Sequence, residues 1–180
     1  FIRCLKTRPA VGAFTATATP EVKDDIIKNL GLKDPQVFIR GFDRPNLKFF
    51  VQKDLKGRQR QDEVLRIIKT QPGSGIVYTI SRKETEEMAS FLSANGIKSV
   101  AYHAGLQKDS RTRIQNDFME NRFKVIVATI AFGMGVDKAD IRFVIHAGMP
   151  STLEGYYQEA GRAGRDGEQA YCILLHSKRD

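Results

Sequence analysis

The sequence predicts an α/β fold of three layers, with a mostly parallel central sheet flanked by helices on both faces. Short apolar runs alternate with longer segments whose apolar residues recur at helical spacing, and this alternation continues along nearly the whole chain. The segments between successive apolar runs are long enough for the helical crossover that parallel strands require. Strands and helices that alternate in this way build sheets covered on both sides.

Capping residues mark the ends of the predicted helices. A proline at the first helical position and a glycine just beyond the last residue bracket the first helix. Ser81 and Glu84 have the spacing of a capping box, and Ser151 and Glu154 repeat it. Helices are therefore predicted at residues 20–30, 58–70, 81–95, 108–121 and from 151 onward.

The short apolar runs between these helices are the predicted strands. Residues 123–127 are apolar at four of five positions, which is typical of a parallel strand buried on both faces. Strands are predicted at residues 75–80, 98–103, 123–129, 141–146 and 170–175, and extended segments at 36–39 and 47–52.

The composition favours a polyanionic partner. The 180 residues carry a net charge of +8 and 41% apolar residues, enough for a packed core. Basic domains without such a partner also exist, so charge alone leaves this open. Two distant cysteines and three scattered histidines predict neither a metal site nor a disulfide. No apolar run or leader pattern predicts a membrane span or secretion.

The most informative stretch is residues 158–167, Gln-Glu-Ala-Gly-Arg-Ala-Gly-Arg-Asp-Gly. Arg162 and Arg165 fall at or just past the end of a predicted helix, and Gly161 and Gly164 remove side-chain bulk beside them. Two residues spaced i,i+3 on a helix project from one face, and paired guanidiniums suit a phosphate because each can bind it through two hydrogen bonds. The alternative is a solvated Gly/Arg-rich turn.

A second stretch, Ala-Thr-Ile-Ala-Phe-Gly-Met-Gly-Val-Asp at residues 128–137, directly follows a predicted strand. Polar groups in this position lie at the carboxyl edge of a sheet, where open α/β sheets bind their ligands. Gly133 and Gly135 would let the backbone approach a ligand closely. The alternative is an ordinary glycine-rich loop.

These two stretches and others along the chain resemble the motifs of superfamily 2 helicases, above all those of the RecQ family of DNA helicases. Residues 41–47 and 156–159 are similar to RecQ sequences, whereas DEAD-box RNA helicases would be expected to carry histidine in place of Gln158. The similar stretches follow the family's order: motif III at 14–19, motif IV at 75–83, residues 102–106, motif V at 128–140 and motif VI at 158–167.

The resemblance implies a RecA-like fold and divides the chain in two. Residues 1–40 would be the C-terminal end of a first RecA-like lobe, and residues 41–180 the second lobe, or helicase C-terminal domain. The Walker A loop and acidic motif that hold nucleotide and magnesium do not occur in these 180 residues. ATP and Mg²⁺ would thus be bound mainly by a first lobe outside this sequence, and zinc only in a region beyond it. We expect no ATP hydrolysis by the chain alone.

The resemblance also assigns residues on the nucleotide side. Arg162 and Arg165 coincide with the two arginines of motif VI and would act as arginine fingers on ATP held across the cleft. Asp137 resembles the acid that contacts the nucleotide ribose, with a turn or helix cap as the alternative. Gln158 and Gly135 would also lie beside the nucleotide.

A second set of residues would contact the nucleic-acid backbone. Ser81 heads a helix directly after a strand, with Arg82 adding charge, and small hydroxyls at helix N-termini suit phosphates. Thr129 and His103 match strand-binding positions of the family. Ser81 is also a plain N-cap, and a histidine at a strand end is more often structural. A solvated helix face is the expectation for Lys108, Arg111 and Arg113.

The function implied is the second motor lobe of an ATP-dependent 3′→5′ DNA helicase, active in recombination and repair in the cytoplasm or nucleus. Its partners would be single-stranded and duplex DNA and the first lobe of the same protein. Two alternatives stay open: a lobe of an RNA helicase or duplex translocase, and a helicase-derived binding module without ATPase activity.

Overall fold

The computed structural model describes residues 7–15, 19–39, 43–55, 57–133 and 136–177, and the chain divides into two compact units, Phe1–Asp43 and Arg44–Asp180. The predicted lobe boundary after residue 40 falls beside residues outside the described part. That the first unit is the end of another lobe remains a prediction.

The first unit contains helix α1 (Pro20–Leu30). The Thr19 hydroxyl accepts a hydrogen bond from the Val22 amide at its start, and Gly31 adopts a left-handed conformation at its end. Because proline suits the first helical position and glycine the left-handed cap, both predicted ends are confirmed. The predicted extended segment 36–39 contains no strand.

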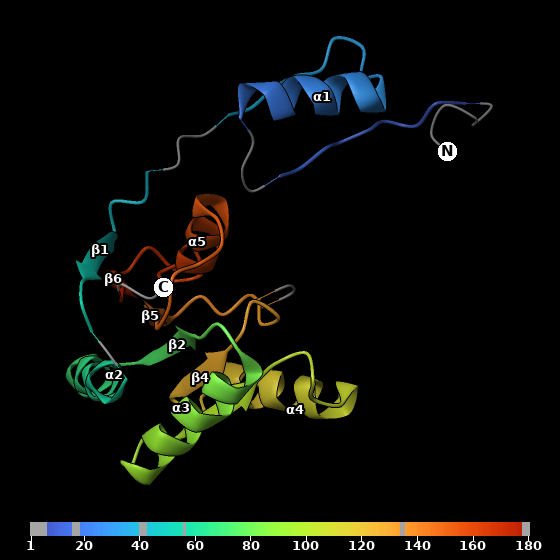
Figure 1. The fold of residues 1–180 in the computed structure, drawn as a ribbon. Coiled ribbons are helices and arrows are strands. Elements are labelled where there is room, and N and C mark those ends of the chain that lie inside the picture. Colours follow the sequence, from blue (N-terminus) through green and yellow to red (C-terminus); the bar gives the residue numbers. More distant parts are fainter. Residues whose placement is uncertain (1–6, 16–18, 40–42, 56, 134–135, 178–180) are drawn as a thin grey trace. The chain divides into compact units, whose positions relative to one another are not determined.

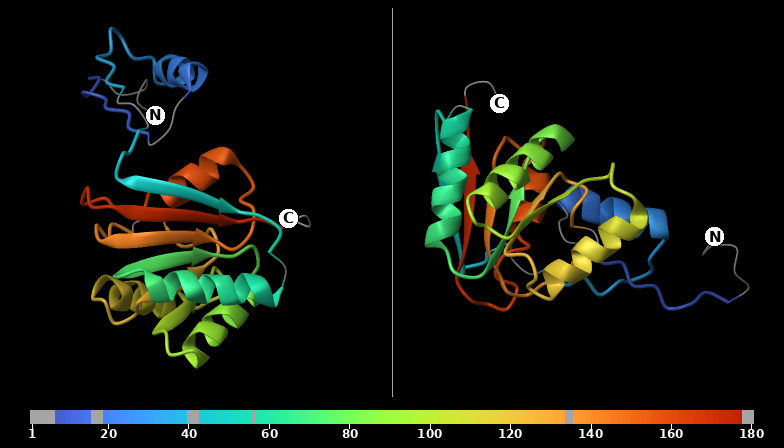
Figure 2. Two further views of the ribbon diagram at one scale, coloured as in Figure 1. Left: turned by 90° about the vertical axis from the view of Figure 1, so that its left-hand side faces the viewer. Right: turned by 90° about the horizontal axis from the view of Figure 1, so that it is seen from below.

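The second unit is built on one parallel sheet with strand order β1-β6-β5-β2-β4-β3. Every pair of neighbouring strands is parallel, and the left view of Figure 2 shows the arrows pointing the same way. The predicted parallel α/β fold is confirmed. The strands are β1 (Leu47–Gln52), β2 (Ser74–Tyr78), β3 (Ser99–Tyr102), β4 (Val125–Ala128), β5 (Ile141–His146) and β6 (Ala170–Leu175).

Helices cover both faces of this sheet (Figures 1 and 2). Alternate residues along β2 enter opposite cores: Val77 packs with residues of α2 and α3, whereas Ile76 and Tyr78 pack with residues of α4 and α5. The helices are α2 (Arg58–Thr70), α3 (Arg82–Ala94), α4 (Lys108–Met119) and α5 (Leu153–Ala160). No helix in the described part of the chain has the length and apolar character needed to span a bilayer.

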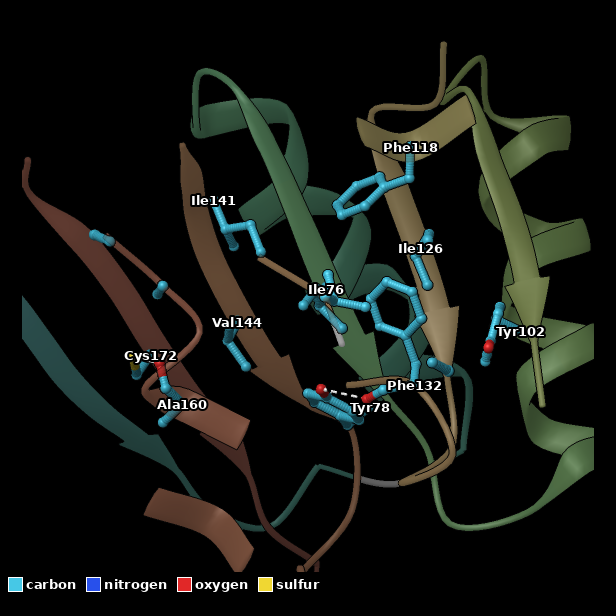
Figure 3. Packing of buried hydrophobic residues seen from close by; sticks show 14 of the residues in the cluster. Ile76, Tyr78, Tyr102, Phe118, Ile126, Phe132, Ile141, Val144, Ala160 and Cys172 are labelled. Atoms are coloured by element: carbon cyan, nitrogen blue, oxygen red, sulfur yellow. Dashed lines mark hydrogen bonds between the residues drawn. The ribbon is translucent and has the colours of Figure 1, made fainter. Parts of the chain in front are cut away.

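The core on the α4 side holds the loop that follows β4 (Figure 3). Phe132, from this loop, is 1% exposed and lies edge-on against Tyr102 and Phe118. The Tyr78 hydroxyl donates a hydrogen bond of 3.0 Å to the Phe132 carbonyl, drawn as a dashed line in Figure 3. The loop that follows β4 is therefore fixed to the core by the buried Phe132 ring and by the hydrogen bond from Tyr78 of β2.

One predicted helix start was wrong by a residue. The residue that caps α5 is Thr152, whose hydroxyl accepts a hydrogen bond of 3.0 Å from the Gly155 amide. Ser151 was expected to cap it with Glu154. The last extended residue before the helix is Thr152 (φ −140°, ψ 156°), and only a hydroxyl at that position faces the free amides of the first turn.

Candidate functional site

The predicted site residues follow the carboxyl ends of adjacent strands. Strands β2, β4 and β3 are neighbours in that order, and the segments after them contain Ser81, Thr129 and His103. Because the strands are parallel, these segments meet at one edge of the sheet. The loop after α5 supplies the two arginines.

The arginine loop, Gly161–Glu168, begins where α5 ends and consists of successive turns rather than helix. The i,i+3 geometry of a helix face therefore does not apply to its two arginines. Arg162 Nη1 donates a hydrogen bond of 2.6 Å to the carbonyl of Gly133. A Cβ atom at residue 133 would overlap the Arg162 guanidinium, so the group that comes close to Gly133 in this structure is an arginine side chain.

Arg165 is the more exposed of the two arginines. Its Nη1 donates to Asp137 Oδ1 at 2.7 Å and to the Val136 carbonyl at 3.3 Å. The Asp137 side chain is 86% exposed, and an ion pair so accessible to water contributes only about 0–1 kcal/mol. Arg165 can therefore exchange this carboxylate for another anion at little cost.

The other two nucleotide-side predictions are Gln158 and Gly135. Gln158 lies in the last turn of α5 with an exposed side chain. Gly135 lies outside the described residues. The structure thus brings together Arg162, Arg165 and Asp137.

A buried polar pair that the sequence analysis did not predict lies against the Tyr78 ring. His146 Nε2 and Glu159 Oε2 are 2.8 Å apart, with side chains 2% and 12% exposed, and the Tyr78 ring stacks on the imidazole. Burial raises the pKa of the Tyr78 hydroxyl far above its ordinary value, and the nearby Arg162 guanidinium opposes that rise. Glu159 lies within residues 158–167, the stretch that contains the two arginines, and this position was the one sequence feature that could have pointed to the pair.

On the nucleic-acid side, Ser81 is the N-cap of α3, as predicted. Its hydroxyl accepts from the Glu84 amide at 3.2 Å, and the Glu84 carboxylate accepts from the Ser81 amide, which completes the capping box. The Ser81 hydroxyl is thus already used by the helix. Ser81 is nevertheless exposed to solvent.

Arg82 and His103 converge on Gly105. A Cβ atom at residue 105 would lie 3.0 Å from Arg82 Nη1 and 3.1 Å from His103 Nδ1. His103 is 4% exposed, and its Nε2 lies 3.0 Å from Glu86 Oε1. His103 is therefore a buried side chain paired with Glu86, whereas the exposed Arg82 provides the accessible charge.

Thr129 follows β4 and is half-buried. Its amide donates to the Tyr102 carbonyl at 3.3 Å, and its hydroxyl accepts a bond of 3.4 Å from the Ala131 amide. The long second bond leaves the hydroxyl able to engage a phosphate oxygen.

The whole edge therefore offers guanidiniums, hydroxyls and amides, which are phosphate-binding groups. Within the described ranges, no group of three or more histidine, cysteine, aspartate or glutamate side chains could hold a metal ion. A separate cavity of about 530 Å³, lined by residues such as Arg60, Thr79 and Ala147, contains none of the predicted site residues.

The family described as helicase conserved C-terminal domain matches residues 58–167, more than half of the chain. The chain belongs to this helicase family. The match includes the segments that carry Ser81, His103, Thr129, Asp137 and both arginines, so all of the converging residues lie inside the family domain.

Relatives of this helicase domain confirm the resemblance to the RecQ family. It is 48% identical over 170 residues to the RecQ-like DNA helicase BLM of Xenopus laevis, covering 93% of this chain and 12% of the relative. It is 46% identical over 178 residues to the ATP-dependent DNA helicase RecQ of Bacillus subtilis, covering 99% and 30%. A putative ATP-dependent RNA helicase, R290 of Acanthamoeba polyphaga mimivirus, is 44% identical over 169 residues, covering 93% and 30%. The chain thus spans less than a third of these relatives.

Solved structures agree on the fold of the helicase domain. Dbp5 of S. cerevisiae, bound to RNA and ADP BeF3, matches with a TM-score of 0.77 at 22% identity, over 92% of this chain and 44% of that one. A DEAD box protein from Methanococcus jannaschii matches with a TM-score of 0.70 at 23% identity, over 90% and 44%. The RecA-like fold predicted from the resemblance is confirmed.

Proposed function

We propose that the chain is the second motor lobe of an ATP-dependent 3′→5′ DNA helicase of RecQ type. The observation that carries the proposal is the pair Arg162 and Arg165, which bind Gly133 and Asp137 at the edge of a RecA-like sheet. Residues 1–40 would then be the end of the first lobe. Single-stranded and duplex DNA would be the partners, with roles in recombination and repair in the cytoplasm or nucleus.

Phosphoryl transfer from ATP builds negative charge around the γ-phosphoryl, and an arginine from a facing surface is worth about 10³–10⁵ in rate. Arg165 would leave its exposed ion pair with Asp137 to bind a phosphate oxygen. The released Asp137 carboxylate could then accept hydrogen bonds from ribose hydroxyls. Arg162, held by the Gly133 carbonyl, would supply the more rigid second charge.

Nucleotide and Mg²⁺ would be held mainly by the first lobe, so the chain alone would not hydrolyse ATP. Hydrolysis would require the two lobes to close, which couples the chemical step to movement. Strand tracking would rely on Ser81, Arg82, His103 and Thr129, since backbone contacts carry no base specificity.

The test is steady-state ATPase activity of this chain joined to its native first lobe, without nucleic acid, with single-stranded DNA, or with RNA. We expect strong stimulation by DNA, and Arg165→Ala should remove most turnover while DNA affinity changes little. Equal loss of turnover and DNA binding would contradict the finger assignment.

An RNA-directed motor is the second candidate, because one relative is named a putative RNA helicase. Stimulation by RNA alone would favour it. Absence of turnover under every condition, in a folded two-lobe protein, would leave a binding module as the better account.

A further inference from the structure

The first residues of the second unit hold the arginine loop through side-chain hydrogen bonds. Arg44, the first residue of that unit, is half-buried. Its Nη1 donates to the Gly161 carbonyl at 3.1 Å, and its Nη2 donates to the carbonyls of Ala163 at 3.0 Å and Gly164 at 2.6 Å. One guanidinium thus engages three carbonyls of a loop that is 117–120 residues away in sequence.

Asn46 adds two further hydrogen bonds to the loop. Its Nδ2 donates to the carbonyls of Gly164 at 2.8 Å and Glu168 at 2.9 Å. Gly164 has φ +55°, and a Cβ atom there would lie 2.6 Å from Asn46 Nδ2 and 2.7 Å from the Glu168 oxygen. Glycine is therefore required at residue 164 for the amide of Asn46 to reach the loop.

We propose that Arg44 and Asn46, which we call the carbonyl clamp, are positioning residues for Arg162 and Arg165. The proposal rests on the proposed function, because it concerns how the arginine fingers are presented. Carbonyls of the loop are held by the clamp, while the two guanidiniums reach Gly133 and Asp137.

The loop depends on hydrogen bonds, and not on regular secondary structure, for its shape. It contains neither helix nor strand, and its backbone is tied to the sheet by bonds such as those from the Gly164 amide to the Ile141 carbonyl and from the Asp166 amide to the Ala139 carbonyl. A misplacement of about 1 Å in a catalytic group can cost about 100-fold in rate. The five side-chain bonds of the clamp add to these backbone bonds and to the Arg142–Asp166 pair in holding the two arginines in place.

The positive charge of Arg44 is a second reason to expect a positioning role. Gly161 is the C-cap of α5, and the free carbonyls at a helix C-terminus carry partial negative charge. Left exposed, these oxygens would repel a phosphate approaching Arg162 and Arg165. Arg44 binds the Gly161 carbonyl at this helix end and two loop carbonyls, so its positive charge offsets their partial negative charge beside the proposed phosphate site.

The experiment uses the two-lobe protein with Arg44→Ala, Arg44→Lys and Asn46→Ala. We expect kcat for ATP to fall about 10- to 100-fold in Arg44→Ala, with KM and DNA affinity nearly unchanged. Lysine keeps the charge but not the fork that reaches three carbonyls, so Arg44→Lys should lose an intermediate amount. An unchanged kcat in Arg44→Ala would overturn the proposal.

Lys124→Ala is the matched control. Lys124 Nζ also clamps two carbonyls, those of Ile68 at 2.9 Å and Gln71 at 3.0 Å, but these lie at the end of α2. Its removal should lower stability without lowering kcat. Equal loss of kcat in the Lys124 and Arg44 variants would show a general stability effect and would overturn the positioning role.

A double-mutant cycle separates this proposal from the proposed function. In an Arg162→Ala, Arg165→Ala background, Arg44→Ala should change kcat by less than about twofold, because nothing remains to be positioned. Fully additive losses would overturn the clamp. If the arginine variants themselves keep full turnover, the proposed function fails instead.

Hydrogen exchange then tests the clamp without ATPase activity. Exchange of the Gly164 amide should accelerate in Arg44→Ala and stay unchanged in Lys124→Ala. Unchanged exchange in both variants would overturn the clamp whatever the kinetics show.

Discussion

His146 Nε2 lies 2.8 Å from Glu159 Oε2, and this buried pair joins the end of β5 to the last turn of α5. His146 Nδ1 is also buried and has no hydrogen-bond partner within the described part of the chain. The helix that leads into the arginine loop is thus attached to the sheet through a buried polar pair.

Removing the carboxylate should destabilise the protein. Glu159→Ala leaves a buried imidazole unpaired, and we expect a loss of about 3 kcal/mol in the free energy of unfolding. Glu159→Gln keeps an oxygen acceptor and should lose about 1 kcal/mol. Urea unfolding at pH 7 measures both.

Glu154→Ala provides the comparison for this pair, because Glu154 is exposed in the first turn of the same helix. It should cost about 0.5 kcal/mol through the helix dipole alone. Similar losses at residues 154 and 159 would mean that the buried pair contributes nothing special.

Gly133→Ala should imitate the loss of Arg162. The added methyl group would overlap the Arg162 guanidinium, which must then leave the Gly133 carbonyl. In the two-lobe protein we expect ATP turnover to fall nearly as far as in Arg162→Ala, on the order of 100-fold or more. Gly96→Ala is the control, because Gly96 has φ +80° but open space around it, so it isolates backbone strain.

Single-stranded DNA affinity should fall steeply with salt, because phosphate contacts release counterions. Arg82→Ala should reduce the slope of log K against log salt by about 0.7, the value for one phosphate on a single strand. Arg66→Ala, which removes an exposed arginine paired with Glu63 on α2, should leave the slope unchanged. A flat profile in the unaltered protein would argue against backbone tracking.

The Cys172 thiol should resist modification in the folded protein. Burial raises its pKa to about 12 from an ordinary value of 9.0, although the Arg44 charge opposes this rise. In a Cys4→Ser variant, we expect a thiol reagent at pH 8 to react about 10³-fold more slowly than in urea, because the reaction requires opening of the sheet.

The same shift makes a prediction about pH. The unfolded thiol loses its proton near pH 9 whereas the folded thiol keeps it, so the free energy of unfolding should fall between about pH 9 and 12. The labelling prediction would be wrong if Cys172 reacted rapidly at pH 8 without denaturant, because the thiol would then be accessible in the folded protein.

Local sequence signals predicted most of the elements correctly. The capping box at Ser81 and the proline and glycine around α1 specify backbone angles within a few residues, so they can be identified without knowing the fold. The start of α5 was missed by one residue, because both Ser151 and Thr152 can cap and only the path of the preceding chain selects between them.

The amino-acid sequence was enough to predict the alternation of strands and helices, the edge at which the motifs lie and the resemblance to RecQ helicases. The contacts of Arg44 and Asn46 with the arginine loop, and the pairing of His146 with Glu159, became evident only from the folded structure. Arg44 and Asn46 donate their hydrogen bonds to backbone carbonyls, which every residue has. The residue types in the loop therefore cannot predict these bonds. Contacts between residues 117–122 positions apart depend on β1 pairing with β6, and that strand order is set by packing of the whole sheet.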